Sequence, residues 1–90
     1  MSHAVVLQVK LQETSPEEGM KMLNELVIPT AKALSGFQKG TWMRSVDNTG
    51  VGIVVFDTAE DATAAQASLN PPPGGPTLIS STMYEIAAEA

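Results

Sequence analysis

The segment that most constrains the fold is the apolar run V-G-I-V-V-F at residues 51–56. Both sets of alternating side chains in this run are mostly apolar, so a strand formed there presents an apolar surface on each of its two faces. Strands of this kind are usually covered on both sides. We therefore expect residues 51–56 to form a strand that is buried on both faces.

Three further segments show the period-two alternation that is typical of strands. They are residues 4–12, residues 37–46 and, at the end of the chain, about 78–88. Asp47-Asn48-Thr49-Gly50 supplies turn residues for a hairpin between the second and third strands. The segment Asn70–Pro76, which reads N-P-P-P-G-G-P, cannot continue a helix or enter a central strand, and is expected to form a loop.

Two segments between these strands have helical signatures. Ser15, Pro16 and Glu18 fit the start of a helix with a capping box, and Gly36 can supply the left-handed residue that ends it. Pro29 lies inside this apolar pattern and predicts a kink or a break near Ile28, because proline removes a helical hydrogen bond. A second, shorter and alanine-rich helix is expected after the sequence Thr58-Ala59-Glu60-Asp61, in which the threonine can cap the first turn.

The order strand, helix, strand, strand, helix, strand predicts an α+β, ferredoxin-like fold. Such a fold has a four-stranded antiparallel sheet with the first and third strands in its centre and two helices on one face, and residues 1–90 would form one such domain. The other sheet face is left without a cover, although the strands predict it to be apolar. Either a second copy of the chain packs sheet against sheet, or an apolar ligand binds there. We expect the homodimer, since a whole sheet face is larger than a small ligand can cover.

Charge and composition exclude several classes of partner and cofactor. Five Lys+Arg against ten Asp+Glu give a net charge of −5, which argues against binding nucleic acid or an anionic membrane surface. The chain has no cysteine and one histidine, His3, so it cannot assemble a multi-histidine metal site. Gly50-Val51-Gly52 opens a strand, whereas the glycine-rich loop of a nucleotide site opens a helix. We expect no metal and no cofactor. The first residues carry no basic segment, and no apolar stretch approaches about 20 residues, so a cytoplasmic location is expected.

The segment Leu34–Trp42, L-S-G-F-Q-K-G-T-W, resembles the L-P-G-F-x-x-G-x-W segment of the dimeric α+β barrel superfamily, with Ser35 where proline is frequent. That superfamily includes the antibiotic-biosynthesis-type monooxygenases. The similarity extends through the hairpin Arg44–Phe56, with its D-x-x-G turn, and the order of elements matches over essentially the whole chain. The resemblance implies a dimeric α+β barrel, with a cavity between sheet and helices. In haem-degrading members a helix-borne histidine ligates iron, whereas His3 lies at the start of a strand, so the resemblance does not extend to that activity.

Four residues are candidates for ligand binding in such a cavity. Trp42 and Arg44 lie two residues apart and thus share one face of their strand, where a cation beside an indole can hold a carboxylate or a phenolate. Tyr84 offers a phenol that can donate to a carbonyl oxygen, and His3 is the only histidine available for proton transfer. The alternative for the first pair is that Trp42 fills the core or a dimer interface while Arg44 pairs with an acid. Tyr84 would then edge an interface, and His3 would face solvent near the terminus.

Two functions remain open. In the first, the chain is a homodimeric α+β barrel protein that binds a small apolar or aromatic molecule between sheet and helices and performs no chemistry. In the second, it is a cofactor-independent monooxygenase of the antibiotic-biosynthesis type that oxidises a phenol-like substrate. There Arg44 would stabilise the substrate anion, Trp42 and Tyr84 would orient its ring, and the activated substrate would itself react with oxygen. The shortage of acid and base residues favours the first.

Overall fold

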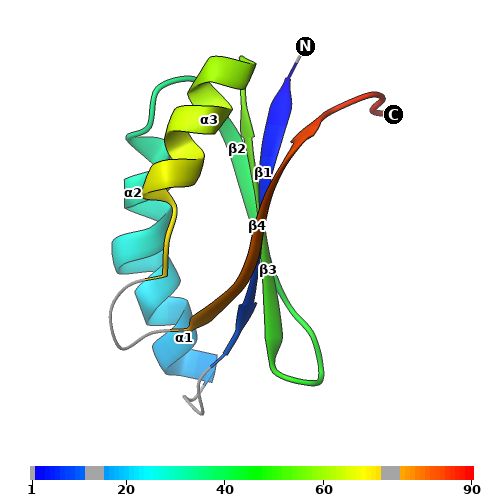
Figure 1. The fold of residues 1–90 in the computed structure, drawn as a ribbon. Helices are drawn as coiled ribbons and strands as arrows, with labels where there is room; N and C mark the ends of the chain where they lie inside the picture. The colour runs from blue at the N-terminus through cyan, green and yellow to red at the C-terminus, as the bar shows by residue number, and fades with distance from the viewer. Residues whose placement is uncertain (1, 12–15, 72–75) are drawn as a thin grey trace.

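A computed structural model describes residues 2–11, 16–71 and 76–90 of the chain. The elements are β1 (His3–Lys10), α1 (Pro16–Met22), η1 (Leu23–Val27), α2 (Ile28–Lys32), β2 (Phe37–Arg44), β3 (Thr49–Phe56), α3 (Ala59–Ser68) and β4 (Thr77–Glu85). The strand order is β2-β3-β1-β4 and every neighbouring pair is antiparallel. Figure 1 shows all helical segments on one face of this sheet. The predicted ferredoxin-like α+β fold, with the first and third strands in the centre, is confirmed.

β1, β2 and β4 end earlier than the sequence pattern predicts, at Lys10, Arg44 and Glu85, whereas β3 begins two residues earlier than predicted, at Thr49. Beyond the regular ladders, single backbone hydrogen bonds follow from the N–H groups of Leu11, Ser45 and Ile86. Ser15, the expected first cap, lies outside the described residues. Among the described residues, no helix has the length and apolar character needed to cross a membrane.

The core fills the end of the molecule at which both termini lie (Figure 1). Its fully buried side chains come from the helix-facing sides of β1 and β3 and from α2 and α3. They are Val5, Ala31, Val54, Phe56 and Ala62, with Ala65 and Leu69 almost as deeply buried. The ring of Phe37 packs edge-on against Phe56 with centroids 6.4 Å apart. The alanines allow α3 to approach the sheet closely, which closes this end of the layer between helices and sheet.

The apolar run 51–56 is buried less evenly than predicted. On the side that faces the helices, Val54 and Phe56 are completely buried, whereas Val51 and Ile53 on the other side are half-buried. No helix covers this second side, which we call the open face (Figure 1). In the single chain, therefore, one face of the strand is packed and the other is partly exposed to solvent.

The helical layer between β1 and β2 contains a π-helical segment, where a kink or break near Ile28 is predicted. Pro29 has no N–H with which to reach the carbonyl of Glu25. Across this segment the N–H of Ile28 bonds to the carbonyl of Leu23, five residues earlier, so the chain accommodates the proline by widening one turn. The helix thus continues to Lys32 without a break, and Gly36 then adopts the expected positive φ of 76°.

The short helix α3 begins as its capping sequence predicts. The side-chain hydroxyl of Thr58 accepts a hydrogen bond of 3.1 Å from the backbone N–H of Asp61. Glu60 and Asp61 stand in the first turn, where negative charge stabilises the helix dipole. These acidic residues are therefore explained by the helix terminus.

Candidate functional site

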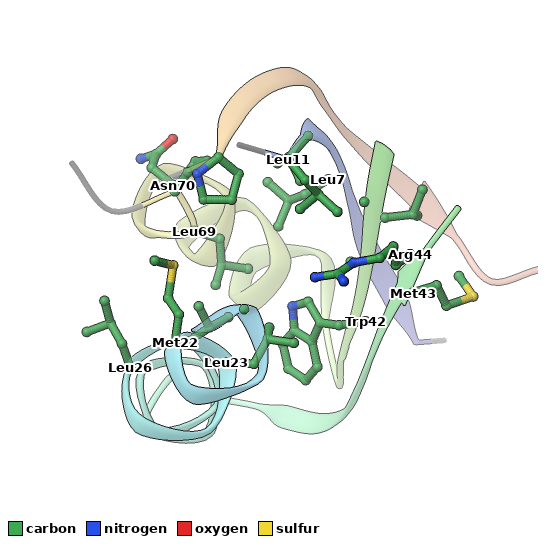
Figure 2. A pocket seen from close by; sticks show the side chains of 18 of the residues that line it. Leu7, Leu11, Met22, Leu23, Leu26, Trp42, Met43, Arg44, Leu69 and Asn70 are labelled. Atoms are coloured by element: carbon green, nitrogen blue, oxygen red, sulfur yellow. The ribbon is translucent and has the colours of Figure 1, made fainter. Parts of the chain in front are cut away.

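A cavity of about 540 Å³ lies between the helical layer and the sheet and adjoins the core, with Leu69 belonging to both. Pockets that bind small molecules commonly enclose about 300–1,000 Å³, so this space is sufficient for a ligand of two or three fused rings. Its walls come from three directions: the helical stretch α1–η1–α2, the sheet, and the segment that follows α3. The apolar side chains that Figure 2 labels around it are Leu7, Leu11, Met22, Leu23, Leu26, Trp42 and Leu69.

Glycines on the sheet, which carry no side chain, create this space. Gly50 and Gly52 lie on the helix-facing side of β3, and Gly40 lies in the same layer on β2, because their partners in the ladders are the helix-facing residues of the neighbouring strands. The indole of Trp42 lies flat in the gap. A Cβ at Gly52 would stand 2.9 Å from its Cδ1 atom, and a Cβ at Gly40 would stand 2.5 Å from Cη2. The tryptophan thus occupies the room that two glycines leave, and it forms one side of the cavity.

Only two charged residues line the cavity within the described part of the chain, Glu18 and Arg44. Figure 2 shows the guanidinium of Arg44 extending from β2 into the cavity, on the side of the Trp42 indole that carries its nitrogen. No carboxylate among the described residues lies within ion-pair distance of Arg44; the ion pair found elsewhere joins Lys39 and Glu89 at 3.8 Å. Arg44 is thus the cation that the described residues place at a mostly apolar cavity, which Glu18 also lines.

The structure brings together two of the four candidate residues. Trp42 and Arg44 share the helix-facing side of β2 and both line the cavity, as their spacing predicts. Tyr84 pairs with Ala4 and so projects from the open face, on the opposite side of the sheet, where it is 54% exposed. His3 is half-buried at the far end of β1, paired with Phe56 and Glu85, and is not among the residues that line the cavity.

Several cavity residues were not recognisable as such in the sequence. The sequence does contain a signal for Gly50 and Gly52: they are two residues apart, so they must share one face of a strand and leave a gap in its side chains there. The contributions of Leu23, Leu26 and Val27 depend on the π-helical turn, for which the sequence has no comparable signal. Within residues 2–11, 16–71 and 76–90, no group of three or more histidine or acidic side chains is placed to hold a metal ion.

The sheet order and the one-sided helical layer together define a ferredoxin-like α+β fold. Solved structures with this architecture include SnoaB, a cofactor-independent oxygenase from Streptomyces nogalater, and an asparagine-to-alanine variant of it. Each superimposes with a TM-score of 0.72 at 17% sequence identity, and the match covers 98% of this chain and 95% of the SnoaB chain. No protein-family model matches the chain, and no curated protein is significantly similar in sequence. The fold that the sequence resemblance implies is therefore confirmed.

Proposed function

We propose that the protein binds a small aromatic molecule in the cavity and holds an anionic oxygen of that molecule against Arg44. The observation that supports this is the guanidinium of Arg44, which pairs with no carboxylate among the described residues and is directed into a mostly apolar cavity of about 540 Å³. Planar guanidinium groups donate two parallel hydrogen bonds to the two oxygens of a carboxylate and also donate to the single oxygen of a phenolate, and these bonds strengthen when water is excluded. The indole N–H of Trp42 offers a further donor on the same side. Fused rings would fill the remaining volume against leucine and methionine side chains.

Such a site favours the deprotonated form of its ligand. An apolar environment raises the pKa of a bound phenol, and a neighbouring cation lowers it. With Arg44 in direct contact, the second effect dominates for the oxygen that the guanidinium binds. The ligand would thus bind as an anion with its ring system buried.

A pair of isosteric probes tests this proposal. Naphthalene-1-carboxylate and naphthalene-1-carboxamide have nearly the same shape and differ in charge. Trp42 is the only tryptophan in the chain, so the loss of its fluorescence reports occupancy of the cavity directly. We expect the carboxylate to bind at least about tenfold more tightly, since hydrogen bonds to charged groups contribute about 1.5–3 kcal/mol.

The matched variants are Arg44→Gln, which removes the charge from the cavity, and Lys32→Gln, which removes an equal charge from an exposed position on α2 that does not line it. Arg44→Gln should bind both probes equally, while Lys32→Gln should keep the wild-type preference. Equal binding of the two probes by the wild type would refute the proposal.

A second candidate function is the oxygenation of such a ligand without a cofactor, favoured by the likeness to SnoaB. Arg44 would stabilise the substrate anion, and the anion itself would reduce dioxygen. For anthrone, whose enol is a phenol, the balanced reaction consumes one dioxygen and releases one quinone and one water. We would measure dioxygen uptake and quinone formation with the wild type and Arg44→Gln. A rate equal to that without protein would reject this second function and leave the binding function intact.

The same proposal includes a homodimer formed through the open face. This face carries apolar side chains from all four strands and has no helix over it (Figure 1). Sheet-to-sheet contact between two copies would bury the half-exposed side of β3. Native mass spectrometry of the protein purified without added ligand reports both the subunit number and any retained small molecule; a monomer would contradict this part of the proposal.

A further inference from the structure

A glycine in the first helix lies directly against the guanidinium of Arg44. Gly19 is in the interior of α1 and lines the cavity beside Arg44. A Cβ at this position would stand 2.7 Å from the Nη2 atom of Arg44, closer than non-bonded atoms approach one another. Only a residue without a side chain leaves the guanidinium where it is.

No other property of this position calls for glycine. Among the described residues, the glycine with positive φ is Gly36, so Gly19 has a backbone conformation that any residue adopts. Glycine inside a helix destabilises it by about 0.5–1 kcal/mol relative to alanine. The contact with Arg44 is thus the feature of the structure that explains an unfavourable residue in this helix.

We propose that Gly19 is a positioning residue, which sets the place of the Arg44 guanidinium and hence the place at which the cavity binds an anionic oxygen. This inference rests on the proposed binding function. Since no described carboxylate pairs with Arg44, the wall of α1 rather than an ion pair defines where its charged end lies. The bare helix backbone at Gly19 lets the guanidinium lie close to α1, where both residues line the cavity.

The variant Gly19→Ala should therefore have effects of opposite sign on stability and on binding. Its Cβ displaces the far end of a flexible side chain, which costs little, while the helix gains intrinsic stability. The unfolding midpoint should stay equal or rise. The displaced guanidinium should lower the preference for the charged probe, and the affinity for the neutral probe should change little. A purely structural glycine would instead lower stability and both affinities together.

The experiment uses the full chain and compares wild type, Gly19→Ala, Arg44→Gln and the double variant, with Asn24→Ala as the control. Asn24 is an exposed helical residue that does not line the cavity. The binding readout is the ratio of dissociation constants for naphthalene-1-carboxamide and naphthalene-1-carboxylate, from the fluorescence of Trp42. The ligand-free readout is the NMR signal of the arginine Nε–H group, which is a single signal because Arg44 is the only arginine in the chain.

We expect Gly19→Ala to reduce the ratio at least about fivefold, and the double variant to match Arg44→Gln, because both substitutions act on one interaction. The arginine signal should move in ligand-free Gly19→Ala and stay in place in Asn24→Ala. If Gly19→Ala keeps both the ratio and the arginine signal of the wild type, the positioning role is rejected while the binding function stands. If the wild type shows no charge preference, the binding function fails, and the role of Gly19 fails with it.

Discussion

Single residues decide how much open space the protein keeps beside its sheet. Gly52 is the clearest case, because it lies under the edge of the Trp42 indole, in the centre of the sheet. Valine or isoleucine is favoured at a central strand position, and glycine is disfavoured there. Glycine at position 52 lowers the stability of the strand, but it leaves room for the indole of Trp42. The cavity therefore remains open beside the indole.

We predict that Gly52→Ala impairs both stability and binding. The new Cβ would meet the Cδ1 and Nε1 atoms of Trp42 at 2.9 and 3.0 Å, so the rigid indole must move toward the cavity. Overpacking of this kind costs about 1–3 kcal/mol of unfolding free energy. Urea unfolding measures that loss, and the fluorescence titration should show at least about fivefold weaker binding. Thr41→Ala, on the other side of β2, serves as the control; unchanged binding by Gly52→Ala would show that the cavity lies elsewhere.

The candidate residues show which side-chain placements the sequence can predict. Trp42 and Arg44 are two residues apart in one strand, so their common face follows from the geometry of the strand itself. Tyr84 is in another strand, and its face depends on the register between β4 and β1, which contains an irregularity after Gln8. A shift of one residue reverses the face of every side chain, so its position could not be derived from alternation alone. Gly19 gave no signal, since its contact with Arg44 joins two elements far apart in the sequence.

At the scale of elements, the β2–β3 hairpin contains the one described group whose titration is clearly perturbed. The hydroxyl of Ser45 hydrogen-bonds to the carboxylate of Asp47 and holds its pKa below the ordinary value of 3.8, assisted by Thr49. Asn48 takes a positive φ of 68° at the tip, a conformation that asparagine tolerates well. The hairpin thus forms at the predicted place, with Asp47 and Asn48 in its turn, whereas Thr49 and Gly50 already belong to β3.

The sign of the resulting pH dependence follows from this lowered pKa. The unfolded state takes up a proton on Asp47 at a higher pH than the folded state does. The contribution of the ionised Asp47 to the free energy of unfolding is therefore complete above about pH 4, and it is lost as the pH falls through the pKa of Asp47 in the folded state. We predict that Asp47→Asn flattens the loss of stability between about pH 4 and pH 2. Urea unfolding midpoints across this range measure it, with Glu25→Gln, on the exposed side of η1, as the control. Equal slopes for wild type and Asp47→Asn would contradict the assignment.

Elements differ in how far the sequence predicts them. The cap at Thr58 and the end near Gly36 follow from local chemistry, and both are confirmed. The effect of Pro29 was predicted at the right place, and the structure has a π-helical turn there instead of a break. Proline forbids one hydrogen bond, but whether the helix then kinks or widens by a residue depends on how the turn packs against the sheet.

At the scale of the whole molecule, the open face is the surface through which we propose that the homodimer forms. Ile53 is half-buried at its centre, on the middle strand β3. We predict that Ile53→Lys produces a folded monomer, since two like charges would meet near the symmetry axis of a sheet-to-sheet dimer. Light scattering after size-exclusion chromatography measures the mass, and circular dichroism verifies the fold. Asn24→Lys, on the helical layer, adds the same charge away from the open face and should remain dimeric; a dimer of Ile53→Lys would exclude this interface.

The global fold was predictable because several independent local patterns agree on one arrangement: four alternating segments, two helical segments and turn residues between them. The cavity was harder to predict. It depends on the distance between the helical layer and the sheet, and that distance is set by the alanines of α3 at one end and by the π-helical turn at the other. Spacing between layers is a tertiary property, which periodicity along the chain does not contain.

The placement of Tyr84 and Trp42 on opposite faces of one sheet gives the protein two optical reporters, since each is the only residue of its kind. Tyrosine absorbance and emission respond to what covers the open face, and indole emission responds to what enters the cavity. A titration followed at both signals therefore separates subunit association from ligand uptake without any added label. If one signal responds to the event on the other face, the four strands transmit a signal between cavity and interface.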